Sequence, residues 1–266
     1  MTGVAATLAK ARGENRAALV GYLPVGFPDV QGSIEAMVAM VESGVDIVEI
    51  GVPYSDPLMD GPVIQHAAEA ALQRGSRLAD VFTAVRAVAD AGAPALVMTY
   101  WNPVVRYGVD RFARDLANAG GAGLITPDLV PDEADDWVAS ADATGLDKIF
   151  LVAPSSTDER LRRTAQACRG FVYAAAVMGV TGARDASSDL AAPLVERTRA
   201  VTDLPVCVGI GVSGGDQAAE VAAYADGVIV GSAFVRRLLD AGPDRAAGLA
   251  SLAELTRDLA EGVRRA

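Results

Sequence analysis

The chain has few of the side chains that most enzymes use for nucleophilic or metal chemistry. Among 266 residues it has one histidine, His66, two cysteines, Cys168 and Cys207, and two lysines, Lys10 and Lys148. One imidazole excludes metal sites built from two or three histidines, and it would have to serve any Ser-His-Asp or Cys-His catalyst alone. The cysteines form no CxxC pair, so we expect buried thiols in a reducing compartment. We therefore expect carboxylates to carry any proton transfer, and we expect no metal site.

Positive charge is also scarce, with 23 Lys+Arg against 34 Asp+Glu and a net charge of −11. So acidic a chain is not expected to bind nucleic acid or an anionic membrane surface, and an anionic ligand would have to be held by local backbone geometry. Charged residues such as Lys10, Arg12 and Arg16 interrupt the N-terminal segment, which therefore lacks a secretory h-region. Uncharged stretches such as Phe171–Ala183 fall short of the roughly 20 residues of a membrane helix. We expect a cytoplasmic protein without a membrane segment.

Short apolar runs rich in valine and isoleucine recur along the chain, and segments of helical periodicity separate them. Because the runs are continuous rather than alternating, they are typical of parallel strands buried on both faces. The predicted strands are Ala18–Leu23, Val45–Ile50, Ala95–Tyr100, Gly123–Thr126, Lys148–Ala153, Phe171–Ala176, Pro205–Gly209 and Asp226–Gly231. The predicted helices are Gln31–Ser43, Leu78–Ala91, Val109–Ala119, Asp132–Thr144, Asp158–Ala167, Leu190–Val201 and Gly214–Ala223, with an amphipathic helix in Pro243–Ala266.

Eight strand–helix units in 266 residues give a period of about 33 residues, as in a (β/α)8 TIM barrel of about 250 residues. We therefore predict an α/β fold in which residues 1–266 form a single (β/α)8-barrel domain with extra terminal helices. The alternative, an open doubly wound sheet, requires a GxGxxG turn after its first strand. The sequence there reads GYLPVGFPD, so the barrel is favoured.

Two carboxylates lie near the C-terminal end of the second predicted strand, where a barrel of this kind carries its active site. Alternation places Val45, Ile47 and Glu49 on one face of this strand, and Asp60 lies in the loop that follows. Burial among apolar neighbours would raise the pKa of Glu49 toward a range useful for acid–base catalysis. On this evidence alone, Glu49 could equally be a buried carboxylate satisfied by a backbone group or an arginine. Asp60 could likewise be a turn residue or a helix N-cap.

Glycines follow the last two predicted strands, in the segments CVGIGVSGG and GVIVGSAFV. Gly209, Gly211, Gly231 and Ser232 would let backbone N–H groups converge on a phosphate, as barrels do after strands seven and eight. The polar segment Val177–Ser188 is either a mobile lid over this site or an ordinary surface loop.

The segment VEIGVPYSDPLMDGP at residues 48–62 resembles the signature of the tryptophan synthase alpha subunit family. The segments GVTGA at 179–183, GIGVS at 209–213 and GSA at 231–233 resemble its later motifs, and the likeness extends from about Gly21 to Val235. It implies retro-aldol cleavage of indole-3-glycerol phosphate into indole and glyceraldehyde 3-phosphate. Glu49 would shuttle a proton to indole C3 and from the glycerol hydroxyl. Asp60 would accept the indole N–H, and Thr181 would bind Asp60 when the lid closes.

The resemblance also implies the residues that line the substrate site. An apolar slot for the indole would be formed by Tyr22, Tyr100, Ile125, Leu151, Tyr173 and Ile210, each of which could instead be barrel core. The phosphate would be held by Gly182, Gly211, Gly231 and Ser232. Two positions depart from the family pattern: Ile210 stands where many members have an aromatic residue, and Met59 replaces a smaller one. His66 has no catalytic role in the family and is expected on the helix surface or in packing.

The family likeness implies no cofactor in this chain. It implies a beta subunit that carries pyridoxal phosphate, in an alpha2beta2 complex, contacted by Tyr54–Gly61 and by the region around Asn102. Three alternatives stay open: a free-standing indole-3-glycerol-phosphate lyase, a phosphosugar isomerase or epimerase, and a barrel that only binds a ligand to regulate a partner. A Schiff-base aldolase is disfavoured because Lys148 lies at the N-terminal end of its strand, and a metal-dependent aldolase because imidazoles are lacking.

Overall fold

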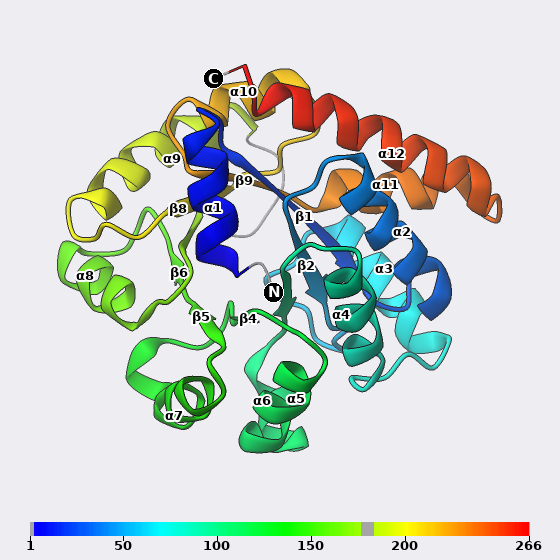
Figure 1. Ribbon diagram of the computed structural model, residues 1–266, viewed down its shortest axis with the longest axis horizontal. Coiled ribbons are helices and arrows are strands. Elements are labelled where there is room, and N and C mark those ends of the chain that lie inside the picture. The colour runs from blue at the N-terminus through cyan, green and yellow to red at the C-terminus, as the bar shows by residue number, and fades with distance from the viewer. Residues whose placement is uncertain (1–2, 177–183, 266) are drawn as a thin grey trace.

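The computed structural model describes residues 3–176 and 184–265, and its strands form one parallel sheet that closes on itself (Figure 1). The sheet order is β5-β4-β3-β2-β1-β9-β8-β7-β6. The strands are β1 Ala18–Pro24, β2 Ile47–Gly51, β3 Ala95–Met98, β4 Gly123–Ile125, β5 Asp147–Ile149, β6 Leu151–Val152, β7 Val172–Ala175, β8 Val206–Gly209 and β9 Gly227–Val230. β5 pairs with β4 and β6 pairs with β7, with only Phe150 between them. They are two halves of one strand, which closes an eight-stranded barrel and confirms the predicted fold.

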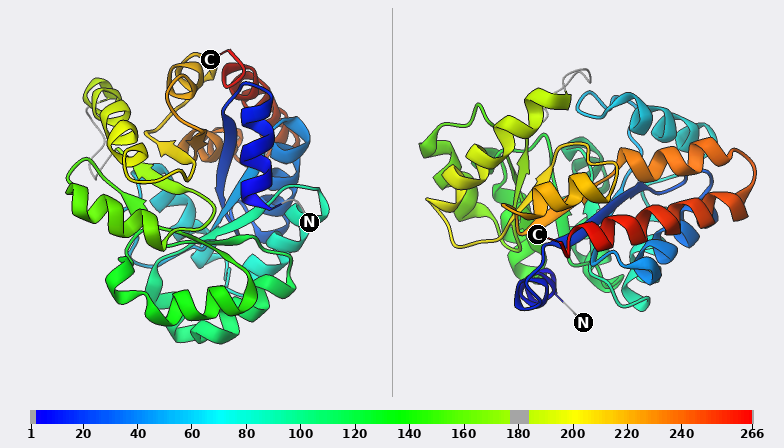
Figure 2. Two further views of the ribbon diagram at one scale, coloured as in Figure 1. Left: turned by 60° about the vertical axis from the view of Figure 1, so that its left-hand side comes forward. Right: turned by 90° about the horizontal axis from the view of Figure 1, so that it is seen from above.

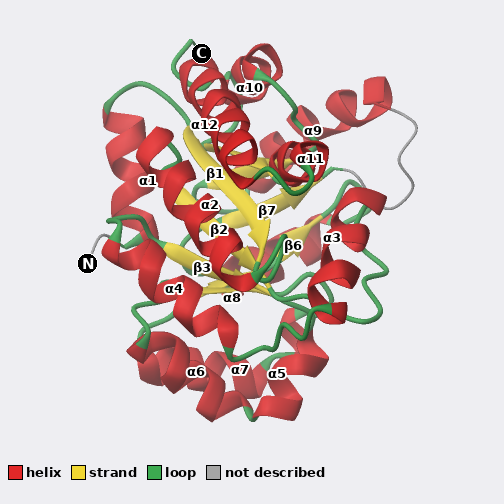
Figure 3. Ribbon diagram, turned by 90° about the vertical axis from the view of Figure 1, so that its right-hand side faces the viewer, coloured by secondary structure: helices red, strands yellow, loops and turns green. Residues whose placement is uncertain are grey.

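Helices surround the sheet (Figure 3). They are α1 Val4–Gly13, α2 Val30–Ser43, α3 Pro62–Gln73, α4 Asp80–Asp90, α5 Trp101–Tyr107, α6 Val109–Asn118, α7 Asp135–Thr144, α8 Asp158–Ala167, α9 Arg184–Arg199, α10 Gly215–Ala222, α11 Ser232–Ala241 and α12 Arg245–Gly262, with a 3-10 turn η1 at Pro131–Glu133. The predicted helix Asp132–Thr144 is divided at Ala134 into η1 and α7. The C-terminal helix packs against α2, α10 and α11, on the outside of the barrel (Figure 2).

Two apolar clusters fill the molecule. The larger lies between strands and helices, and the smaller occupies the barrel interior, with Val20, Ile47, Ile149 and Cys207 among its members. Residues of α1 join the interior cluster, so this helix covers the N-terminal end of the barrel, where Figure 1 shows it inside the ring of helices. The other end is therefore the end at which a ligand can enter the barrel.

Ion pairs tie the strand ends beside α1. Asp46, just before β2, accepts hydrogen bonds from the Arg16 guanidinium at 2.7 and 2.8 Å and from the Leu19 amide at 2.8 Å. Asp226, just before β9, accepts from the Val206 amide at 2.9 Å and from the guanidinium of Arg12 at 2.7 Å. Each carboxylate thus satisfies a neighbouring backbone donor as well as an arginine, and this end of the barrel is built for stability.

The two cysteines and the two lysines lie away from the C-terminal strand ends. Cys207 is buried in the barrel interior, whereas Cys168 is only half-buried, and both are free thiols. Lys148, in β5, pairs with Asp142 at 2.6 Å, and Lys10 lies on α1 near Glu14. Neither lysine is positioned to form a Schiff base at the C-terminal ends of the strands.

Candidate active site

Glu49 is fully buried in β2, where its backbone is in register with Tyr22 on β1 and Leu96 on β3. Neither carboxyl oxygen has a hydrogen-bond partner among the described residues. Burial alone raises the pKa of Glu49 to about 8, because the charged form loses its solvation and gains no compensating cation. No backbone group or arginine of the described chain satisfies this carboxyl. An unpaired buried carboxyl is costly to stability and typical of a functional site.

Asp60 lies in the loop between β2 and α3, and the loop is fixed by hydrogen bonds around it. The Asp60 amide donates to the Pro57 carbonyl at 3.0 Å, and the Asp60 carbonyl accepts from the Gln65 side chain at 2.9 Å. Gly61, not Asp60, is the N-cap of α3, so the carboxylate is free for another role. Burial raises its pKa to about 6, and the hydrogen bond that the Tyr100 hydroxyl donates to it acts in the opposite direction.

Three tyrosines interact electrostatically with one or both of the two carboxyl groups. The pKa values of Tyr22 and Tyr173 are raised well above the usual range, mainly by burial, and both Glu49 and Asp60 add to the shift. Both carboxyls therefore lie within electrostatic reach of the same two rings. Tyr100, beyond β3, contacts the site through Asp60. The structure thus brings together, from four strand ends, the five residues that sequence reasoning placed here separately.

Glycines leave the space that the tyrosine rings occupy. A Cβ atom at Gly209 would lie 2.6 Å from the Tyr173 hydroxyl, and one at Gly51 would overlap the Tyr22 ring. A Cβ at Gly231 would lie 3.2 Å from Tyr22 Cδ1. Gly209 and Gly231, which the sequence suggested for phosphate loops, therefore also leave room for these two tyrosine rings.

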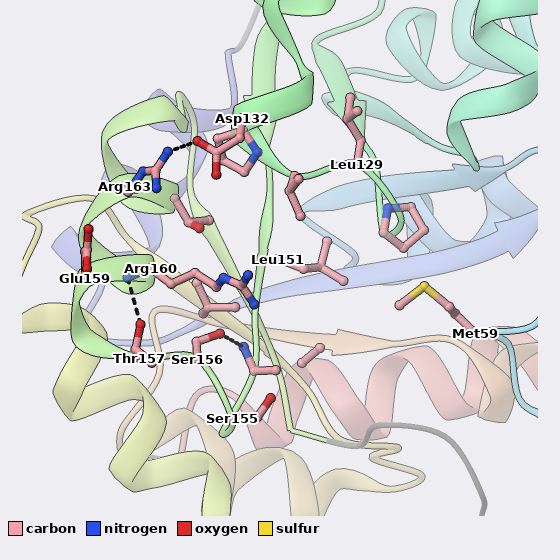
Figure 4. A pocket seen from close by; sticks show the side chains of 17 residues that line it. Met59, Leu129, Asp132, Leu151, Ser155, Ser156, Thr157, Glu159, Arg160 and Arg163 are labelled. Atoms are coloured by element: carbon pink, nitrogen blue, oxygen red, sulfur yellow. Dashed lines mark hydrogen bonds and ion pairs between the residues drawn. The ribbon is translucent and has the colours of Figure 1, made fainter.

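The three aliphatic residues expected in the indole slot lie in different surroundings. Ile125 is fully buried in the barrel interior. Leu151 is half-buried and lines a cavity of about 500 Å³ together with Met59; Figure 4 shows Leu151 between Met59 on one side and Arg160 on the other. Ile210 packs against the outer core cluster, because Cys207 and Gly209 take the inward positions of β8. Its place against an indole stays a prediction.

The two helix starts beyond β8 and β9 differ as anion sites. At α10 the Gly215 amide already donates to the Asp258 carboxylate at 2.7 Å, and the Ser213 amide donates to Gln217 at 2.9 Å. At α11, in the described structure, the amides of Ser232 and Ala233 have no such acceptor. Gly211 has a φ of +80°, which suits glycine. Among the described groups, the start of α11 therefore offers two backbone donors that have no acceptor, whereas the start of α10 does not. Thr181 and Gly182 lie outside the described residues.

Apolar side chains are exposed on the segments that follow β2, β3 and β4, including Val105 in α5. Leu58 is 79% exposed, Met59 45%, Val105 51% and Val130 44%. They follow β2, β3 and β4, at the C-terminal end of the barrel. Large exposed apolar side chains gathered on one face are typical of a surface that binds another protein.

Sequence reasoning missed one feature of the site, a pair of stacked tyrosines. The rings of Tyr54 and Tyr100 have centroids 5.0 Å apart and an angle of 27° between their planes. The only sequence signal was the presence of Tyr54 within the 48–62 signature, because the stack depends on how two loops meet.

His66 is exposed on α3, as expected. The described residues contain no cluster of three or more histidine, cysteine, aspartate or glutamate side chains suited to a metal ion, and no helix long and apolar enough to span a membrane.

Comparisons with known proteins agree with this architecture. The family model for the tryptophan synthase alpha chain matches residues 8–264. The tryptophan synthase alpha chain of Mycobacteroides abscessus is 65% identical over 257 residues, covering 97% of this chain and 95% of that protein. The protein of the same description from Thermobifida fusca is 61% identical over 269 residues, covering 100% and 99%.

Solved structures show the same likeness. A chain of Mycobacterium tuberculosis tryptophan synthase superposes with a TM-score of 0.92 at 59% identity, covering 98% of both chains. Tryptophan synthase subunit alpha from Legionella pneumophila gives 0.90 at 32% identity, covering 99% of this chain and 98% of the other. The chain therefore belongs to the tryptophan synthase alpha chain family, the lyases of tryptophan biosynthesis that cleave indole-3-glycerol phosphate.

Proposed function

We propose that Glu49 and Asp60 carry the cleavage of indole-3-glycerol phosphate in this chain, with Glu49 moving the protons and Asp60 stabilising the cationic ring. The observation that supports this most directly is the Glu49 carboxyl, fully buried and without a partner among the described residues. Glu49 lies toward the barrel end where substrate can enter. Asp60 and Glu49 both raise the pKa values of Tyr22 and Tyr173, so the two carboxyls share one environment.

The two carboxyls suit different steps because their pKa values differ. At neutral pH Glu49, with a pKa of about 8, holds a proton and donates it to C3 of the indole. The ring nitrogen then gains positive character, and Asp60, with a pKa of about 6, is mostly ionised and accepts the ring N–H. These are general acid catalysis and electrostatic stabilisation of the same intermediate.

The Glu49 carboxylate left by this step takes the proton from the glycerol hydroxyl. The carbon–carbon bond breaks, the hydroxyl carbon becomes the aldehyde of glyceraldehyde 3-phosphate, and the bond electrons neutralise the ring cation to give indole. Glu49 ends protonated, as it began. One carboxyl therefore serves as acid and then base, and no proton is gained or lost overall.

The phosphate of the substrate would bind at the start of α11. The amides of Ser232 and Ala233 are free there among the described groups, and the positive end of the helix dipole favours an anion. Gly211 and Gly231 would allow close approach of the phosphate to the backbone. A phosphate can thus be held without a lysine, in a chain of net charge −11.

We also propose a beta subunit as partner, docked on the exposed apolar residues Leu58, Met59, Val105 and Val130. Solved relatives include chains of Mycobacterium tuberculosis tryptophan synthase. Released indole would pass to that subunit, which would supply pyridoxal phosphate, within an alpha2beta2 complex in the cytoplasm. The described residues offer no lysine at the C-terminal ends of the strands to bind such a cofactor here.

Indole release by the purified chain, assayed with and without a beta subunit, tests this function. We expect slow release from indole-3-glycerol phosphate by the chain alone and stimulation by the partner. High activity that the partner leaves unchanged would instead indicate a free-standing lyase. Turnover of a ribulose or triose phosphate without indole release would indicate an isomerase or epimerase.

A further inference from the structure

We propose that Tyr54 is a positioning residue for Asp60: it holds the Tyr100 ring so that the Tyr100 hydroxyl stays on the Asp60 carboxylate. The proposal rests on the proposed role of Asp60 in the reaction. Tyr54 itself would touch neither substrate nor reacting atoms.

The contacts connect two loops that are separate in the sequence. Tyr54 follows β2 and Tyr100 follows β3, and their rings stack with centroids 5.0 Å apart. The Asn102 side-chain amide donates a hydrogen bond to the Tyr54 hydroxyl at 3.2 Å. The Tyr54 ring is therefore held from the β3 side by both a stacking contact and a hydrogen bond, although much of its own loop is exposed.

The Tyr100 hydroxyl has a defined orientation at the other end of this arrangement. It accepts a hydrogen bond from the Met59 amide at 3.0 Å, so its single proton is available to the Asp60 carboxylate. The next residue is anchored as well, because the Trp101 amide donates to Asp128 at 2.9 Å. The Tyr100 ring stacks on the ring of Tyr54. Tyr54 lies in the same loop as Asp60, between β2 and α3.

Asp60 depends on this hydroxyl because its other neighbours do not favour its charge. Tyr22 from β1 and Tyr173 from β7 lie within electrostatic reach of Asp60 as neutral groups, and Glu49 from β2 lies within electrostatic reach of the same two residues. Burial opposes ionisation of Asp60, and the Tyr100 hydroxyl favours it. If the ring were free to turn, Asp60 would hold its proton to higher pH and accept the indole N–H less often.

The test compares Tyr54→Ala, Tyr54→Phe and Tyr100→Phe with a matched control, Tyr107→Phe. Tyr107 is a suitable control because its hydroxyl also donates to an aspartate, Asp115, at 2.6 Å. Two quantities are measured from about pH 5 to about pH 9: kcat/KM for indole release, and the Asp60 carboxyl titration by carbon-13 NMR, which needs no activity.

Tyr54→Ala is expected to raise the Asp60 midpoint by about half a pH unit, which lowers kcat/KM about threefold at pH 5.5 and hardly at pH 8. Tyr100→Phe is expected to raise it by about one unit. Tyr54→Phe keeps the ring and should titrate close to the wild type, as should Tyr107→Phe. Adding Tyr54→Ala to Tyr100→Phe should cause no further shift, since Tyr54 acts through Tyr100.

A fall in kcat/KM of equal size at all pH values, with an unmoved Asp60 midpoint, would overturn the proposal. So would a Tyr54→Ala shift that persists in the Tyr100→Phe background. If Tyr54→Ala loses the native circular dichroism spectrum, Tyr54→Leu is judged by the same criteria. An NMR midpoint that moves while the rate profile stays fixed would support the positioning role and count against the proposed role of Asp60 in catalysis.

Discussion

Glu49 and Asp60 are carboxyl side chains eleven residues apart in the sequence, and the structure gives them opposite protonation states near neutral pH. Burial raises the pKa of Glu49 to about 8 and that of Asp60 to about 6. The proposed reaction needs Glu49 protonated and Asp60 ionised, so activity should fall below pH 6 as Asp60 gains a proton. It should also fall above pH 8 as Glu49 loses one. We therefore expect a bell-shaped profile of kcat/KM, with only the acid limb altered in Tyr100→Phe. A rate that still rises through pH 8 would contradict the assignment of Glu49 as the initial acid.

At the scale of elements, the start of α11 is free for an anion while the start of α10 is occupied by Asp258. Ser232→Asp should keep the helix, because a carboxylate is stabilising in a first turn, yet it should repel the substrate phosphate. We expect KM to rise by a factor on the order of ten or more, with thermal stability retained. The neutral control Ser232→Asn should change KM much less. Equal effects of the two substitutions on KM would place the phosphate elsewhere.

For the whole molecule, the two ends of the barrel have different tasks, stability at the α1 end and chemistry at the other. The Arg16 side chain is 6% exposed and pairs with Asp46 at 2.7 Å. Arg16→Met leaves this carboxylate without its cation and should lower the free energy of unfolding by about 3 kcal/mol. Activity at low temperature should be retained. Lys10→Met, which removes an exposed cation, should leave stability unchanged. Chemical denaturation measures the free energy of unfolding of both variants. A single unfolding transition is expected if the chain is one domain. Lost activity with unchanged stability would contradict this division.

Much of the fold could be predicted from the sequence, because most strands lie in short, largely apolar runs that alternate with segments of helical periodicity. The position of Glu49 followed from alternation within one strand, which needs no tertiary information. The Tyr54–Tyr100 stack, the division of the fifth strand at Phe150 and the capping of α10 by Asp258 could not be predicted. Each of these depends on contacts between segments whose relative placement is set only by the closed barrel.

In the proposed reaction the buried carboxyl of Glu49 moves the protons. Indole release by Glu49→Gln tests this role. We expect cleavage to fall by at least about a thousandfold, because the amide can neither donate nor accept the proton.

The same variant should be more stable than the wild type above about pH 5. The unfolded chain releases the Glu49 proton near the ordinary pKa of 4.5, whereas the folded chain holds it to about pH 8. Stability of the wild type therefore falls as pH rises through this window, and glutamine removes that loss. An inactive variant with raised Tm at pH 8 is the predicted result. Activity near that of the wild type in a folded Glu49→Gln protein would exclude Glu49 as the group that moves the protons.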